Sequence, residues 1–183
     1  MYHDYNMEKI LDHIRTCPKK KFILDTDTFN EIDDQFALSL AMLAQDKLNL
    51  VAVTAAPFHH DKSDSFADGM ERSYREIGIC TKLVQESHGV AIPPYYRGSV
   101  ERMPDEDTPV QSEAAEAIYR HVMESDEITY IAAIGAITNV SSAILLHPEI
   151  KEKIDHKPRI SRFKFQTIPV YHNGLPIVIE DGT

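Results

Sequence analysis

KFILDTDTFNEIDDQFALSL, residues 21–40, is the stretch that decides the fold. Its apolar run ends at Asp25 and Asp27, and a second pair of acids, Asp33 and Asp34, begins six residues after Asp27. Beyond the second pair the apolar residues recur at helical spacing. A strand that delivers acids at its C-terminal end, followed by acids at the start of a helix, is typical of sites in open α/β sheets. The stretch therefore predicts the active centre of the protein.

Composition restricts the class of protein around this centre. The chain has 183 residues, of which 43% are hydrophobic and 26% charged, so it can bury the core of one domain. A net charge of −10 argues against a nucleic-acid partner. No apolar run reaches the roughly 20 residues of a membrane span, and the N-terminus does not look like a secretory signal. The two cysteines, Cys17 and Cys80, have no metal-like spacing. By elimination, we expect a cytoplasmic protein that does not bind membranes. Whether it forms a homo-oligomer is left open.

Hydrophobic periodicity predicts alternating strands and helices. Buried strands are expected at 22–25, 48–54 and 128–134, with a short one within 89–98; helices are expected at 7–14, 33–45, 69–84, 111–123 and 138–146. Continuous apolar runs with β-branched residues suit strands that are covered on both faces of a parallel sheet. The predicted fold is α/β and Rossmann-like, with a mainly parallel sheet of about four or five strands and helices on both faces.

The pattern changes near the C-terminus. Residues 1–154 are expected to form the α/β domain. Residues 155–183 contain three prolines and two short apolar pieces with no clear helical period. This tail is expected to be either a β-hairpin turning at 172–174 or poorly ordered.

The four acids of the opening stretch lie within ten residues and would repel each other unless something neutralised them. Ca²⁺ and Mg²⁺ prefer oxygen ligands and acidify bound water, so a neighbouring carboxylate could then act as a general base. The plain structural interpretation is that some of these acids cap a helix while others are solvated. An apolar strand directly before the cluster favours the functional interpretation.

Two known families share parts of this pattern. The segment LDTDT matches the Asp-x-Asp-x-Thr signature of haloacid-dehalogenase-type phosphatases, in which the first Asp is the nucleophile. The longer segment ILDTDTFNEIDDQFAL resembles the N-terminal signature of the inosine/uridine-preferring nucleoside hydrolases, with two extra residues placed within 29–31. A second motif, Ile134–Asn139, resembles that family's Gly-Pro-Leu-Thr-Asn turn and follows at about the family's distance. Together the two motifs favour the second resemblance, which covers roughly residues 20–154.

The resemblance to nucleoside hydrolases implies a role for each matching residue. Asp27 would bind Ca²⁺ and act as the general base that activates water, and Asp34 would be a second metal ligand. Thr138 would give its backbone carbonyl to the metal, and Asp33 would bind the ribose hydroxyls. Asp25 and Asn139 would not touch the metal or the ribose but would orient the residues that do. The implied reaction is hydrolysis of the N-glycosidic bond of a ribonucleoside. From the residues alone, Thr138 and Asn139 can equally be explained as a helix cap.

The sequence also departs from the family. The Gly-Asn that usually follows the second strand is replaced by Ala56–His60, so His59 or His60, and Asn30 and Glu31 from the two-residue insertion, are candidates for the missing ribose contacts. The late Asp that ligates the metal in the family has no identifiable counterpart here. We therefore expect weak or absent activity from the isolated chain. A phosphatase of the Asp-x-Asp type and a non-catalytic binding domain are the alternatives.

Overall fold

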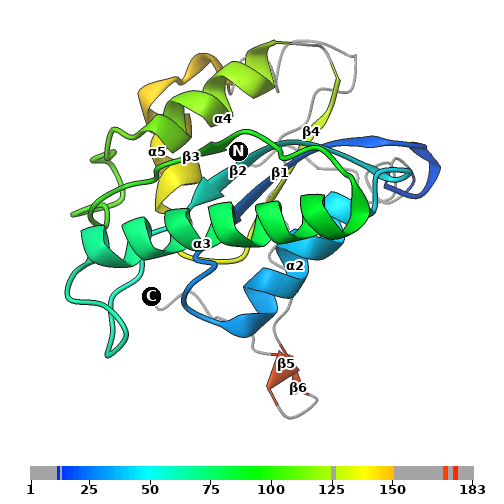
Figure 1. Cartoon of the computed structure of the whole chain (residues 1–183). Coiled ribbons are helices and arrows are strands. Elements are labelled where there is room, and N and C mark those ends of the chain that lie inside the picture. Colours follow the sequence, from blue (N-terminus) through cyan, green and yellow to red (C-terminus); the bar gives the residue numbers. More distant parts are fainter. Residues whose placement is uncertain (1–11, 13, 125–126, 151–170, 173–174, 177–183) are drawn as a thin grey trace.

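The protein contains a four-stranded, fully parallel sheet with helices on both sides (Figure 1). The computed structural model describes residues 12, 14–124, 127–150, 171–172 and 175–176. In spatial order the strands are β3 (Tyr95–Tyr96), β2 (Leu48–Ala55), β1 (Lys20–Thr26) and β4 (Thr129–Ala133). The predicted α/β class with a parallel sheet is confirmed.

Helices cover the two faces of the sheet in pairs. The helices around the sheet whose bounds the structure describes are α2 (Ile32–Leu43), α3 (Phe66–His88), α4 (Glu113–Met123) and α5 (Thr138–Leu146). One core lies between the sheet and α2 and α3, and includes Leu38 and Ile77. The other lies between the sheet and α4 and α5, and includes Ile118 and Val140. Both faces of the strands are therefore buried, which explains why the strands read as continuous apolar runs.

The order of the strands places a switch point beside β1. The chain moves from β1 to β2 and β3 in one direction, then returns across the sheet to β4 on the other side of β1. Asp25 is in register with Thr54 of β2 and with Ala133 of β4. Ligands of open α/β sheets bind outside the carboxyl ends of the strands at such a point. The fold thus brings the acidic stretch and the 134–139 motif to one edge of the sheet.

Helix α3 is longer than its periodicity predicts, because both ends are capped. Ser65 accepts a hydrogen bond from the backbone N–H of Asp68, which starts the helix three residues before the predicted position. Gly89 ends the helix with a φ of 69°, in the left-handed region that suits glycine. The helix tolerates Gly78 in its middle.

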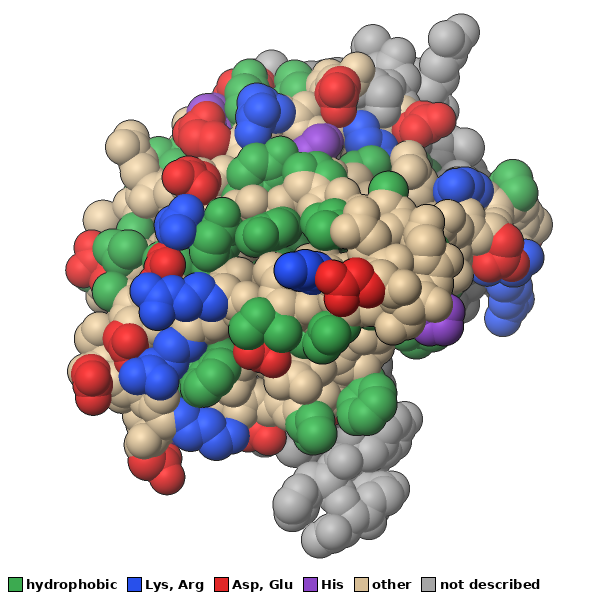
Figure 2. Space-filling model, viewed as in Figure 1, with side chains coloured by type: hydrophobic (Ala, Val, Ile, Leu, Met, Phe, Trp, Pro, Cys, Tyr) green, Lys and Arg blue, Asp and Glu red, His purple; other side chains and the backbone are tan. Residues whose placement is uncertain are grey.

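Helix α2 differs from α4 in what its outer side presents. Four large apolar side chains of α2, Ile32, Phe36, Leu40 and Leu43, are exposed, whereas no large apolar side chain of α4 is exposed. Figure 2 shows hydrophobic side chains over α2 and α3, interrupted by charged ones. The α2 side of the described structure therefore presents more apolar surface than the α4 side.

Two predicted regions lie at or beyond the limits of the described residues. The leading helix predicted at 7–14 falls almost wholly outside them. Most of 155–183 also lies outside, but Tyr171–His172 (β5) pairs antiparallel with Leu175–Pro176 (β6). Within the described ranges, no helix combines the length and apolar character that crossing a membrane requires.

Candidate active site

Asp25 lies at the end of β1 and is fully buried. Its Oδ1 atom accepts hydrogen bonds from Thr54 Oγ1 at 2.6 Å and from Asn139 Nδ2 at 2.8 Å. Its Oδ2 atom is buried and has no hydrogen-bond partner within the described part of the chain. Unpartnered buried carboxylate oxygens are rare because they lose their hydration without compensation. Such an oxygen lowers stability unless it carries a proton or meets a ligand.

Asn139 joins Asp25 to two other segments. Its amide nitrogen also donates to the carbonyl oxygen of Ala55 at 3.0 Å, and its amide oxygen accepts from both N and Oγ of Ser99, at 2.8 and 3.0 Å. At Gly98 a Cβ atom would lie 1.8 Å from the Ala55 carbonyl oxygen, so only glycine allows this close approach. The fully buried Asn139 thus uses both ends of its amide to lock three chain segments around Asp25.

Asp27 is held from two sides at the start of the β1–α2 connection. Its Oδ2 atom accepts a hydrogen bond from Asn30 Nδ2 at 2.8 Å, and its carbonyl oxygen accepts from the backbone N–H of Asn30 at 2.6 Å. On the other side, a Cβ atom at Gly135 would come within 2.7 Å of Asp27 Oδ1. The β4–α5 turn therefore lies directly against this carboxylate, as the pairing of the two sequence motifs predicts.

Asp33 and Asp34 occupy the first turn of α2, where carboxylates interact favourably with the helix dipole. Asp34 is buried, and its Oδ1 atom accepts a hydrogen bond from Thr26 Oγ1. Asp33 is exposed and can meet a ligand from solvent. The two neighbouring acids therefore face different environments.

Burial raises the pKa of all three inner carboxyls. It raises the pKa of Asp25 to about 7, with hydrogen bonds from Asn139 and Thr54 opposing the effect. It also raises the pKa of Asp34 to about 7, reinforced by the charges of other acids including Asp27. The pKa of Asp27 is raised by burial as well, against the hydrogen bond from Asn30. A site that concentrates unneutralised carboxyl groups is typical of acid–base chemistry or of cation binding.

Of the two adjacent histidines in the loop after β2, the structure brings His60 rather than His59 next to Asn30. His59 is exposed, and its ring lies 5.3 Å from that of Phe66. His60 is half-buried, and its Nε2 atom is hydrogen bonded to Asn30 Oδ1. Asn30 and His60 are thus joined beside Asp27, and His59 lies apart from them.

The burial of Asp25 also bears on the phosphatase alternative. A nucleophilic carboxylate must reach its substrate, but Asp25 has no exposed surface and its Oδ1 is occupied by two hydrogen bonds. Asp25 therefore fits an orienting role better than the role of a nucleophile.

The donors near Asp27 fit a hard divalent cation in their chemistry. Oxygen atoms of Asp27 and Asp34 would hold it, joined by the Thr138 carbonyl in the β4–α5 region, and the cation would relieve the repulsion that helps to raise the pKa of Asp34. Among the described residues, no group of three or more His, Cys, Asp or Glu side chains is placed to hold a metal ion. The set of two carboxylates and a backbone oxygen stays a prediction from the sequence.

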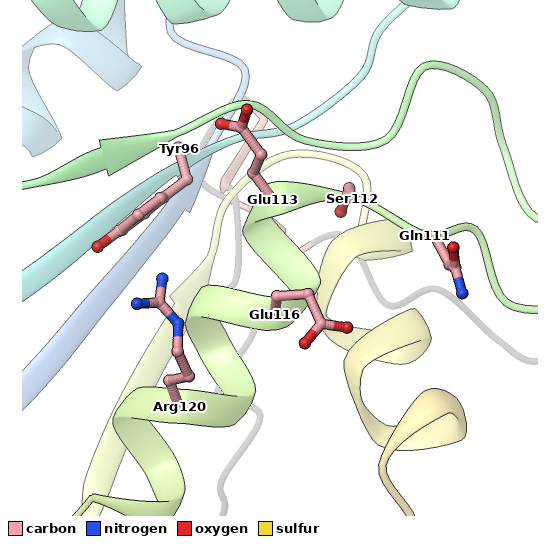
Figure 3. Close-up of a pocket in the computed structure, with 6 residues that line it drawn as sticks. All are labelled: Tyr96, Gln111, Ser112, Glu113, Glu116 and Arg120. Carbon is pink, nitrogen blue, oxygen red and sulfur yellow. The ribbon is translucent and has the colours of Figure 1, made fainter.

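A separate surface hollow with a volume of about 710 Å³ lies between β3 and α4 (Figure 3). Tyr96, Glu113, Glu116 and Arg120 are among its lining residues, and the guanidinium of Arg120 lies 5.6 Å from the centre of the Tyr96 ring. None of the acids of the opening stretch lines it. The hollow is therefore distinct from the carboxylate cluster.

Sequence reasoning missed several members of the site. Ser99 and the contact of Gly135 with Asp27 were not predicted, although Ser99 is hydrogen bonded to Asn139 and Gly135 lies directly against Asp27. The only available signal was position: each lies just past a strand or in a connection at the carboxyl edge of the sheet. Residue type alone did not distinguish His60 from its neighbour.

The sequence matches the family model described as inosine-uridine preferring nucleoside hydrolase over residues 22–157. Among solved structures, the purine-preferring ribonucleoside hydrolase from Gardnerella vaginalis has a TM-score of 0.53 and 18% identity, over 80% of this chain and 48% of that chain. The inosine-uridine preferring nucleoside hydrolase from Bacillus anthracis has a TM-score of 0.46 and 16% identity, over 80% and 49%. A search of curated proteins found no match. The chain thus spans about half the length of these solved structures.

Proposed function

The chain belongs to the inosine-uridine preferring nucleoside hydrolase family, and we propose that it carries the N-terminal part of a site that hydrolyses the N-glycosidic bond of ribonucleosides. The observation that supports this most is the cluster of Asp25, Asp27 and Asp34, three buried carboxyls with raised pKa at the switch point of the sheet. The chain accounts for about half of the length of the solved structures it resembles, so the activity of this chain is itself part of the proposal.

In the proposed reaction, Asp27 is the general base. It takes a proton from a water molecule whose oxygen bonds to the anomeric carbon, while the bond from that carbon to the base nitrogen breaks and its electron pair leaves with the nucleobase. A carboxyl whose pKa is raised towards neutrality is a better proton acceptor than an ordinary one. The leaving nucleobase takes up a proton from solvent and Asp27 later releases its own proton to solvent, so the net reaction adds one water molecule across the N-glycosidic bond. The transition state resembles an oxocarbenium ion, as in the hydrolysis of O-glycosides.

We propose Ca²⁺ as the cofactor, held by Asp27, Asp34 and the carbonyl oxygen of Thr138. When bound, it would acidify the attacking water and hold ribose hydroxyls. Asp33 is exposed beside Asp34 and is proposed to accept hydrogen bonds from those hydroxyls. Asn30 and His59 stay predicted ribose contacts, and Asp25 and Asn139 keep the cluster in place.

The test is nucleoside cleavage by the purified chain, with inosine and uridine as substrates and Ca²⁺ present. Substitution Asp27→Ala removes the base, so we expect the rate to fall at least about a thousandfold. Asp46→Ala, which alters an exposed acid paired with Lys47, is the matched control and should keep the wild-type rate. Undiminished cleavage by Asp27→Ala would exclude Asp27 as the base.

A non-catalytic binding domain is the second candidate. It is favoured because the described residues include no group of three or more His, Cys, Asp or Glu side chains that could hold a metal ion. Calorimetry with Ca²⁺ on wild type and Asp34→Asn separates the two. Cation binding that Asp34→Asn weakens, without nucleoside turnover by the wild type, would favour this candidate over the hydrolase.

A further inference from the structure

Asn30 connects Asp27 with the loop that follows β2. Its side-chain nitrogen donates to Asp27 Oδ2 at 2.8 Å, and its side-chain oxygen is hydrogen bonded to Nε2 of His60. The two residues come from different connections, one before α2 and one before α3. A continuous line of hydrogen-bonding groups therefore runs from the carboxylate of Asp27 to the imidazole of His60.

The contact of Lys62 with the His60 ring indicates the direction of each hydrogen bond in this line. The backbone N–H of Lys62 donates to Nδ1 of His60 at 3.2 Å, so Nδ1 is an acceptor and carries no proton. In a neutral imidazole the proton then lies on Nε2, which donates to the amide oxygen of Asn30. The amide nitrogen of Asn30 consequently faces Asp27. The opposite orientation of the amide would place an oxygen against the carboxylate and lose both bonds.

The loop that carries His60 is held on several sides. The Lys62 ammonium donates to the backbone carbonyl of Asn30, and the backbone N–H of His60 donates to Ser63 Oγ at 3.4 Å. The ring of Phe58, which is buried, lies 5.2 Å from that of His60 and stacks on Phe29 at 6.5 Å. The imidazole is therefore placed by packing as well as by hydrogen bonds.

Charged groups near His60 do not reverse this assignment. The carboxylate of Asp61 lies 3.3 Å from Nδ1, but it is fully exposed to solvent. The ammonium of Lys62 is directed at the carbonyl of Asn30 rather than at the ring. The donor at Nδ1 and the acceptor at Nε2 thus place the ring proton of the neutral imidazole on Nε2.

We propose that His60 is a positioning residue for Asp27 and acts through Asn30. His60 fixes the orientation of the Asn30 amide, and the amide fixes the rotation of the Asp27 carboxylate, whose other oxygen faces Gly135. The consequence for catalysis rests on the proposed function, whereas the hydrogen-bond line does not.

The first measurement tests the position of the His60 ring proton and does not require the protein to be enzymatically active. In nitrogen-15 NMR spectra of the imidazole groups of the whole chain, we expect His60 to have its proton on Nε2, visible as a slowly exchanging signal. Asn30→Ala should remove that signal because it removes the acceptor. A proton on Nδ1, or a signal that survives in Asn30→Ala, would overturn the proposal.

The second measurement compares two substitutions that differ only in where they present an amide. Gln at position 60 places its amide nitrogen near the position of Nε2 and can still donate to Asn30, whereas Asn places it near Nδ1 and cannot. We expect His60→Asn to weaken Ca²⁺ binding about tenfold in calorimetry, while His60→Gln stays close to wild type. The matched control is His88→Asn, an exposed histidine at the end of α3.

Kinetics separate this proposal from the proposed function. If the wild type cleaves nucleosides, His60→Asn should lower kcat about tenfold with little change in KM, and His60→Gln should restore most of the rate. Equal effects of Gln and Asn on both calorimetry and kcat would show that His60 does not position Asp27. If the wild type cleaves nothing, the proposed function fails, and the NMR and calorimetry results still decide the role of His60.

Discussion

The two ends of strand β1 each bury a charged residue, and they treat that residue in opposite ways. At the start, Lys21 is 7% exposed and donates from Nζ to the carbonyl oxygen of His121 at 2.6 Å, with the carboxylate of Glu124 at 3.9 Å. At the end, Asp25 is 0% exposed and is surrounded by neutral donors and another acid. At the start of the strand, the Lys21 ammonium thus has the opposite charge of Glu124 nearby, which is how folded proteins usually accommodate a buried ion. The other end concentrates like charges, which only a ligand or a proton can relieve.

A substitution in the middle of the same strand gives a stability loss with which the two ends can be compared. Ile23 is fully buried in the core beneath α4 and α5, and carries no charge. We expect Ile23→Ala to lower the free energy of unfolding by about 2–5 kcal/mol through lost burial and the cavity left behind. Chemical denaturation at pH 5 and at pH 8 should give the same loss. A loss that differed between the two pH values would mean that the core and the carboxyl end are energetically coupled.

At the carboxyl end of β1, the raised pKa of Asp25 should make the free energy of unfolding depend on pH. Because the folded state raises the pKa of Asp25 from 3.8 to about 7, folded Asp25 binds its proton more tightly than the unfolded chain does. The contribution of Asp25 to stability is then fully present below pH 3.8 and is lost as the pH rises towards 7, by up to about 1.4 kcal/mol per pH unit. Asp25→Asn cannot titrate, so its stability should fall less steeply between pH 5 and pH 7.

Denaturation curves with a chelator present would measure these slopes. Asp34, whose pKa is also raised to about 7, should retain a slope of its own in Asp25→Asn. Adding Ca²⁺ should flatten the wild-type curve if the cation binds the ionised cluster. Identical slopes for wild type and Asp25→Asn would show that Asp25 does not hold a proton in the folded state.

The start of the strand should respond least. Lys21→Met keeps most of the side-chain volume but removes the hydrogen bond to His121. Glu124 is 67% exposed and stays hydrated without its partner, so we expect a loss of only about 1–2 kcal/mol. Thermal unfolding would detect it. A loss as large as that of Ile23→Ala would mean that Lys21 contributes much more to stability than a hydrogen bond and a weak ion pair account for.

The sequence predicted the architecture well because the fold depends on period and order. Continuous apolar runs identified the long strands, and their alternation with helical periods implied a parallel sheet. The Ser65 cap, by contrast, was overlooked, although the spacing of Ser65 and Asp68 is a recognisable start signal for a helix.

The site was only partly accessible to such reasoning. The acids were visible as a cluster in one stretch, but the environment that raises their pKa comes from residues far away in the chain. Ser99 and His60 lie in irregular connections, whose paths follow from packing rather than from any local pattern. The exposed apolar side of α2 was also hidden, because periodicity shows that a helix has apolar residues and not which of them are covered.

The bond between Asn139 and Asp25 joins residues 114 positions apart, and this separation has a kinetic consequence. During synthesis at about 5–20 residues per second, Asp25 waits roughly 6–23 seconds before Asn139 has even been added to the chain. In that interval β1 and β2 can pair, but the carboxyl edge lacks the strand and the turn that enclose it. The acidic cluster is therefore among the last parts of the domain to form, and a stalled or misfolded chain would expose it to solvent.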